Sequence, residues 1–173
     1  MAEPTPQERA ITYIETMRQH FATYHNHKEQ MAFVAAALYL TGISALTIQK
    51  DTDWTKIFPY CITNGLVIAL SGFAIAFVSW QLKRRALANH IISACDRLRR
   101  RWVETYPAPD KLPATCAEYD GILMPAFLRQ EIDRMSPLRF WSLPNIITVL
   151  TMIAWGGILL VRIYLAKYPV PKP

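Results

Sequence analysis

Three stretches of this chain contain no charged residue, and they constrain its fold more than any other feature. They cover residues 31–48, 57–82 and 140–161 and are 18, 26 and 22 residues long. A helix needs about 20 apolar residues to cross the hydrocarbon core of a bilayer. Because surface helices of soluble domains keep a polar face toward water, three such stretches predict an all-α membrane protein with three transmembrane helices.

The placement of basic residues predicts how these spans are oriented. Of the 19 Lys and Arg residues, 14 lie in residues 1–30 and 83–139. The other five lie in residues 49–56 and 162–173. Segments rich in Lys and Arg stay in the cytoplasm. We therefore expect a multi-pass protein of the plasma membrane, or of the inner membrane in a bacterium, with a cytoplasmic N-terminus and an outer C-terminus. The first stretch is expected to act as an uncleaved anchor.

These expectations divide the chain into seven segments. They are a cytoplasmic amphipathic helix (1–30), the first span (31–48), an outer loop (49–56), the second span (57–82), a cytoplasmic helix with a linker and an interfacial segment (83–142), the third span (143–166) and an outer tail (167–173).

Helical periodicity continues beyond the membrane ends of the first two spans. The repeating apolar residues are Ile11, Ile14, Met17, Phe21 and Tyr24 before the first span, and Leu87, Ile91, Cys95, Leu98 and Trp102 after the second. Because a short loop joins these spans, we expect both helices to extend into the cytoplasm as an antiparallel helical stalk. A stalk of two helices buries little area, so self-association into a larger bundle is expected to stabilise it.

Prolines divide the rest of the cytoplasmic segment. Pro107, Pro109 and Pro113 are expected to end the second helix and to open an irregular linker. Residues 125–135 predict a shorter amphipathic helix. Residues 138–144 combine a base with aromatic side chains and are expected to lie along the cytoplasmic interface.

A stripe of small residues occurs within the second span. Gly65, Ala69, Gly72 and Ala76 follow the spacing i, i+4, i+7 and i+11 on one helix face. Small side chains allow close helix packing in lipid, where the hydrophobic effect contributes little between helices. The stripe is therefore either a packing seam between subunits or a contact with another span of the same chain.

Asn64 and Asn145 are the most polar side chains within the spans. An unpaired amide in hydrocarbon is costly, so each is expected to find a hydrogen-bonding partner. Pore lining is the alternative interpretation, although no ionisable residue accompanies either amide at depth.

A candidate pH-sensitive cluster lies just before the first span. His20, Tyr24 and His27 share one face of the N-terminal helix. The two histidines lie about 10.5 Å apart along the axis, too far to bind one metal within a single helix. They either come together between copies, as metal ligands or as a pH-sensitive cluster, or are interfacial polar residues of the stalk. The chain contains no motif for catalysis, a cofactor or a metal, so no enzymatic activity, cofactor or resident metal is expected.

Basic residues gather in two clusters after the second span. They are Lys83, Arg84 and Arg85 at its end, followed by Arg97, Arg99, Arg100 and Arg101. The first cluster is expected to contact anionic lipid headgroups. The second binds an acidic soluble partner in the cytoplasm or a nucleotide, or forms a solvated face. No nucleic-acid partner is expected.

The order of a cytoplasmic helix, a tight two-span hairpin and a charged helix resembles the SLATT-type membrane modules of bacterial conflict systems. The resemblance covers roughly residues 7–106 and implies a pore-forming effector. The third span departs from the two-span plan of these modules, and no functional residue is carried over. We therefore expect a small homo-oligomeric membrane protein that perturbs the bilayer under control of its stalk. The alternative is a membrane anchor or scaffold for a soluble partner.

Overall fold

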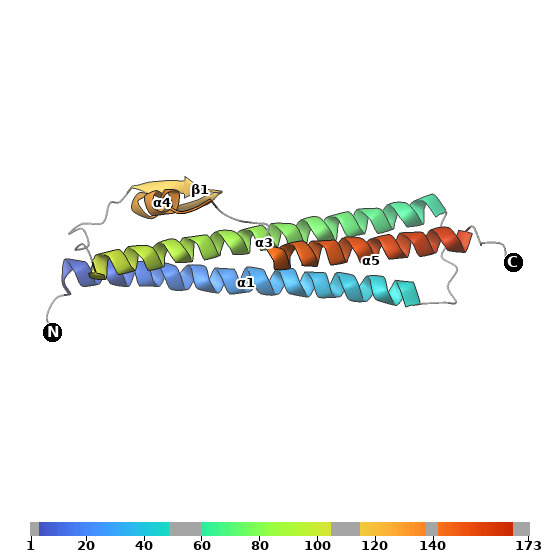
Figure 1. The fold of residues 1–173 in the computed structure, drawn as a ribbon, viewed down its shortest axis with the longest axis horizontal. Helices are drawn as coiled ribbons and strands as arrows, with labels where there is room; N and C mark the ends of the chain where they lie inside the picture. Colours follow the sequence, from blue (N-terminus) through green and yellow to red (C-terminus); the bar gives the residue numbers. More distant parts are fainter. Residues whose placement is uncertain (1–3, 49–59, 105–114, 138–141, 168–173) are drawn as a thin grey trace. The chain divides into compact units, whose positions relative to one another are not determined.

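The computed structural model describes residues 4–48, 60–104, 115–137 and 142–167. Its elements are the helices α1 (Pro6–Ile48), α3 (Tyr60–Glu104), α4 (Ala126–Asp133) and α5 (Leu143–Lys167) and the strands β1 (Cys116–Tyr119) and β2 (Ile122–Pro125), drawn in Figure 1. Three of these helices, α1, α3 and α5, are long and apolar enough to cross a membrane. This confirms three span-length helices. The expected outer loop, the tail after residue 167, residues 138–141 and the three linker prolines lie outside the described residues.

Local side-chain bonds determine where α1 begins. Glu8 Oε2 accepts hydrogen bonds from the backbone nitrogen of Thr5 at 2.8 Å and from its Oγ1 at 3.0 Å. The Glu8 nitrogen donates back to Thr5 Oγ1 at 3.2 Å. This is a capping box, with Pro6 at the first helical position, where its missing N–H costs nothing. The hydrogen bond from the Thr5 backbone lowers the pKa of Glu8.

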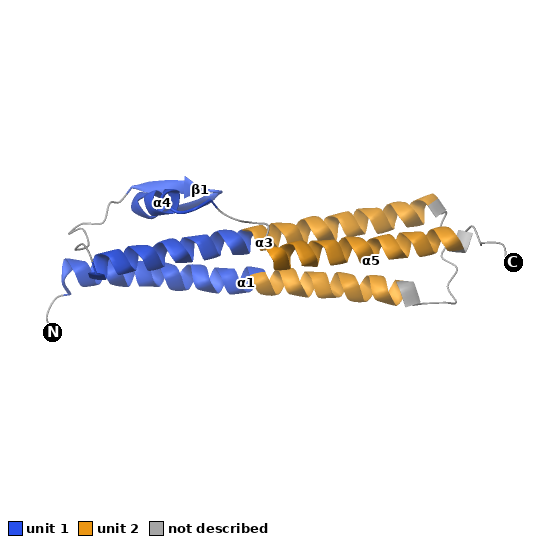
Figure 2. Ribbon diagram, viewed as in Figure 1, with its two compact units in different colours: residues 1–28, 84–139 blue, residues 29–83, 140–173 orange. Residues whose placement is uncertain are grey.

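The chain folds into two compact units, and α1 and α3 contribute to both. Unit 1 consists of residues 1–28 and 84–139, and unit 2 of residues 29–83 and 140–173. Figure 2 shows the two units in blue and orange. Each unit has its own hydrophobic core.

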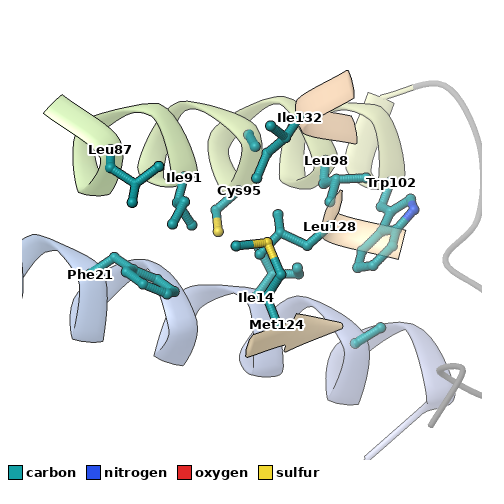
Figure 3. Packing of buried hydrophobic residues seen from close by; sticks show 12 residues of the cluster. Ile14, Phe21, Leu87, Ile91, Cys95, Leu98, Trp102, Met124, Leu128 and Ile132 are labelled. Atoms are coloured by element: carbon teal, nitrogen blue, oxygen red, sulfur yellow. The ribbon is translucent and has the colours of Figure 1, made fainter. Parts of the chain in front are cut away.

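The core of unit 1 draws on four elements. Its buried side chains are Ala10, Ile14 and Phe21 of α1, Leu87, Ile91, Ala94, Cys95, Leu98 and Trp102 of α3, Met124 of β2, and Leu128 and Ile132 of α4. In Figure 3 the labelled side chains of this set lie between the ribbons of α1 and α3. Apolar side chains of α1 and α3 therefore share one core within this unit.

A β-hairpin and α4 complete that core, which sequence analysis did not predict. β1 and β2 are antiparallel, with Tyr119 opposite Ile122. The turn between them is Asp120-Gly121, with φ values of 49° and 79°. Two consecutive residues with positive φ make the tight turn that matches strand twist, and Asp-Gly is a preferred sequence for it. The expected irregular linker is wrong for residues 116–125. The expectation that two helices alone form this core is also wrong, because the hairpin and α4 contribute buried side chains to it.

Polar side chains also join α1 to α3 within unit 1. Gln7 Nε2 donates to the Trp102 carbonyl at 3.1 Å, and Arg18 Nε contacts Asp96 Oδ1 at 2.7 Å. Both charged side chains of the second pair are over one-third exposed. Such an exposed ion pair contributes little stability. These contacts set the alignment of the helices, while apolar burial supplies most of the stability.

In unit 2, Tyr39 of α1 lies where three helices meet. Its hydroxyl donates to Ser71 Oγ of α3 at 2.9 Å and lies 3.3 Å from the Met152 carbonyl of α5. A Cβ atom on Gly156 would lie only 2.7 Å from that hydroxyl. Glycine at this position therefore lets α5 approach Tyr39 closely.

The surface of unit 2 carries many large apolar side chains. Phe73 is 72% exposed and Leu38 is 70% exposed. A soluble protein rarely exposes a large contiguous apolar surface to water. The outward apolar side chains agree with three helices that are suited by length and composition to a membrane.

Candidate functional site

The stripe of small residues on α3 lies on the outside of unit 2. Gly65, Ala69, Gly72 and Ala76 are all exposed. Apart from its chain neighbours and the backbone of its own helix, a Cβ atom added to Gly65 or Gly72 would meet no atom of the described residues within 4 Å. α3 packs within unit 2 through other positions, such as the fully buried Val78. The stripe is therefore open to a neighbouring helix or to lipid.

An apolar hollow of about 220 Å³ opens in the same unit. It is lined by Leu46 of α1, by Thr63, Leu66, Val67 and Leu70 of α3, and by Leu159 and Ile163 of α5. Its lining offers almost no hydrogen-bonding group. The hollow can accommodate hydrocarbon, and its described lining offers little that would orient a polar substrate.

Buried amides mark the apolar interior of unit 2. Asn145 is 4% exposed and Gln81 is 1% exposed. Within the described residues, Gln81 Oε1 and Asn64 Oδ1 are buried without a hydrogen-bonding partner. Sequence analysis had singled out both asparagines but not Gln81, which lies next to the basic cluster at the end of the second span. An unpartnered amide oxygen in apolar surroundings is costly.

The first basic cluster is involved in the packing of unit 1. Arg84 Nη1 donates to the Asp120 carbonyl at 2.8 Å. The Arg85 carbonyl lies 3.2 Å from His25 Nδ1. Lys83 is exposed. Arg84 therefore holds the hairpin turn, a role in addition to the lipid contact expected for this cluster.

The second basic cluster is divided between internal ion pairs and exposed residues. Arg99 Nε lies 3.2 Å from Glu15 Oε1. Arg101 contacts the buried Glu131 of α4 at 2.8 Å. Arg97 and Arg100 are exposed. Two of the four arginines therefore hold elements of unit 1 together, and the other two present their charge outward.

The structure brings His20, Tyr24 and His27 together on one surface of α1. They line an open hollow of about 470 Å³ together with Thr16, Gln19 and Thr23. His20 packs edge-on against Phe21, with ring centroids 5.5 Å apart. Lys28 Nζ lies 5.0 Å from the Tyr24 ring centroid. No group of three or more His, Cys, Asp or Glu suited to a metal occurs in the part of the chain that the structure describes.

A second histidine contact, which sequence analysis missed, lies between α3 and the hairpin. The rings of His90 and Tyr119 stack with centroids 6.3 Å apart. The Arg129 guanidinium of α4 lies 4.6 Å from the Tyr119 ring centroid. Burial, followed by the charge of Arg97, lowers the pKa of His90. Burial is also the main cause of the raised pKa of Tyr119.

The three cysteines differ in exposure. Cys61 and Cys116 are exposed, and Cys95 is buried. Burial, with a smaller contribution from Asp96, raises the pKa of Cys95 to about 12. Because the thiolate is the reactive form, Cys95 is a packing residue rather than a nucleophile.

Comparison with protein families, with curated proteins and with solved structures finds no match to this chain.

Proposed function

We propose that the chain is a small homo-oligomeric integral membrane protein that permeabilises the bilayer under control of its cytoplasmic part. In this proposal α1, α3 and α5 cross the plasma membrane, with the N-terminus in the cytoplasm and the C-terminus outside. The unit 1 parts of α1 and α3 form the antiparallel stalk. The chain then works in the way proposed for the SLATT-type modules that it resembles.

The open stripe on α3 carries this proposal. Gly65, Ala69, Gly72 and Ala76 are exposed, and added Cβ atoms at both glycines would meet nothing within 4 Å. A helix that only faces lipid has no need for small residues at these four positions. Close packing of the same helix in another copy uses them directly.

The buried amide of Gln81 supports a structural response in unit 2. Its Oε1 has no hydrogen-bonding partner among the described residues. A rearranged assembly, or water entering it, would stabilise this oxygen by supplying a donor. A change of packing that gives Gln81 Oε1 a hydrogen-bond donor would therefore be favourable.

Dye release from liposomes that contain the purified full-length chain tests the proposal. Gly72→Leu places a bulky side chain in the stripe, and Gly157→Leu makes the same change at another open glycine, on α5. We expect Gly72→Leu to reduce the oligomer fraction in detergent and the dye release, while Gly157→Leu preserves both. Unchanged permeability with the wild-type chain under every condition of pH and lipid composition would exclude the pore.

A scaffold function is the second candidate, and the exposure of Arg97 and Arg100 favours it. An acidic soluble protein would contact these two side chains, because Arg99 and Arg101 form ion pairs within unit 1. A pulldown with the Arg97→Glu/Arg100→Glu chain tests this function. Loss of a protein that wild type retains, with unchanged liposome permeability, would favour the scaffold over the pore.

A further inference from the structure

The outward face of α1 in unit 1 carries a heptad seam. Its residues are Thr12, Thr16, Gln19, Thr23 and Asn26, which are all exposed and are spaced four, three, four and three residues apart. This is the spacing of the a and d positions through which helices pair in a coiled coil. The buried Ile14 and Phe21, which face the unit 1 core, occupy the heptad position farthest from this seam.

The seam contains no charged residue. Tyr13, His20 and His27 occupy the position that follows each d residue, and they carry no Lys, Arg, Asp or Glu charge either. The charges of this part of α1 are directed elsewhere: Glu15 contacts Arg99, and Arg18 contacts Asp96. A helix face that serves only for solvation normally carries charged side chains. An uncharged face is instead one that two identical copies can share without repulsion.

The seam residues are also chemically self-complementary. Thr16 Oγ1 donates to the Thr12 carbonyl at 2.9 Å, and Thr23 Oγ1 donates to the Gln19 carbonyl at 3.1 Å. Their hydroxyl hydrogens are therefore used within α1. The amides of Gln19 and Asn26 each carry donors and an acceptor, so each can bond to the same residue of another copy. A polar residue at such a position can specify the register of paired helices, at a cost in stability.

We propose that this seam is the contact between two copies of the chain, whose α1 helices pair in parallel and in register around a two-fold axis. The inference rests on the proposed function, because copies inserted in a membrane with the same orientation have parallel α1 helices. In a parallel pair each seam residue meets its own counterpart. The open hollow beside His20, Tyr24 and His27 is then covered by the partner helix.

Disulfide formation in membranes that contain the full-length chain tests the pairing. The background is C61S/C116S, which removes the exposed thiols and leaves the buried Cys95. Single cysteines are placed at Thr16, at Thr23 and, as a control, at the exposed Asn89 of α3. Because a disulfide needs Cα atoms about 4.4–6.8 Å apart, we expect about ten times more linked dimer at Thr16→Cys and Thr23→Cys than at Asn89→Cys.

A charge variant tests whether the cross-link forms through the seam or through random encounters between copies. With the cysteine at Gln19, the substitutions Thr16→Glu and Thr23→Glu place like charges along the contact and are expected to reduce the linked dimer at least about fivefold. Asn89→Glu, the matched control, is expected to leave it unchanged. Equal cross-linking at seam and control positions, or an unchanged dimer in the double glutamate variant, would overturn the pairing.

The mass of the detergent-solubilised chain, measured together with dye release, distinguishes failure of the α1 pairing from failure of the proposed function. An oligomer that releases dye but does not cross-link along the seam contradicts the pairing and leaves the proposed function intact. Seam cross-linking without dye release supports the pairing and contradicts the pore. A monomer at every concentration, with no cross-linking, contradicts both.

Discussion

Arg101 of α3 holds Glu131 of α4 in a two-point ion pair. Nη1 lies 2.8 Å from Oε2, and Nη2 lies 3.1 Å from Oε1. The side chain of Glu131 is only 2% exposed, whereas that of Arg101 is 36% exposed. The cost of burying the carboxylate is therefore offset mainly by the guanidinium, while the guanidinium can still reach water.

This asymmetry predicts different effects for the two halves of the pair. Among the described residues, Arg101→Met leaves the buried Glu131 carboxylate with the longer contact from Arg134 at 3.5 Å. We expect it to destabilise the docking of α4 by about 3 kcal/mol. Glu131→Gln leaves an arginine that water can solvate, so we expect a loss of about 1 kcal/mol. Hydrogen exchange of the α4 amides in the full-length chain measures both values.

Arg100→Met is the matched control, because Arg100 is exposed. Its effect on α4 exchange is expected to be within about 0.5 kcal/mol of wild type. Equal exchange in the Arg101 and Arg100 variants would show that the pair does not hold α4.

The same ion pair shows what limits prediction from this sequence. Four nearby arginines are typical of a solvated or partner-binding face, and nothing local indicates that Arg101 is different. Its partner, Glu131, comes 30 residues later in the chain. Only the fold brings them together. The three apolar helices were predictable because length, apolarity and the absence of charge are local properties.

The hairpin was predictable in part from local signals. Asp120-Gly121 is a recognised hairpin turn, and the residues on both sides can form short strands. The prolines at 107, 109 and 113, however, favour an irregular linker in this region. The burial of Met124 against α1 and α3 depends on tertiary packing, and no short-range pattern indicates it.

The turn glycine provides a second prediction. Gly121 has φ of +79°, which an L side chain adopts only with strain. Gly121→Ala is therefore expected to destabilise the hairpin by about 1 kcal/mol. Faster hydrogen exchange in β1 and β2, with unchanged exchange in unit 2, would demonstrate the local effect. Gly157→Ala, in a helix with open space around it, is the control and is expected to be neutral or slightly stabilising. Identical hairpin exchange in Gly121→Ala and wild type would contradict the strained turn.

Gly156 provides a third prediction in the membrane-suited unit. Gly156→Ala would place a methyl carbon 2.7 Å from the Tyr39 hydroxyl, a distance that forces the packing to shift. We expect a loss of about 1–3 kcal/mol, measured by unfolding of the full-length chain in detergent. Tyr39→Phe removes the clashing oxygen and a hydrogen bond to Ser71. That variant alone is expected to cost about 0.6 kcal/mol.

The double variant decides whether the contact is direct. Because Tyr39→Phe removes the clash, Gly156→Ala is expected to cost less in its presence than in the wild-type background. Additive losses in the double variant would place the effect of Gly156 elsewhere than at the Tyr39 hydroxyl.

The stacked pair of His90 and Tyr119 gives a pH-dependent prediction for the hairpin. Burial, followed by Arg97, lowers the pKa of His90 below its usual value of 6.5. As pH falls through 6.5, the released histidine binds a proton before the packed one does, so protonation favours release. The contribution of neutral His90 to the stability of the packed hairpin is therefore complete above pH 6.5. It is lost as pH falls through the lowered pKa of His90. We expect the protection of β1 and β2 amides, corrected for intrinsic exchange, to be nearly constant above pH 6.5 and to decrease over the interval below it.

His90→Phe keeps an aromatic ring against Tyr119 but cannot bind a proton. Its hairpin protection is therefore expected to vary little with pH over the same interval. His20→Phe is the control, because His20 lies on the exposed face of α1 and not against the hairpin. It should retain the wild-type pH dependence. If the dependence persists in His90→Phe and disappears in His20→Phe, the proton acts at the α1 surface, and the contact between His90 and Tyr119 is only a packing contact.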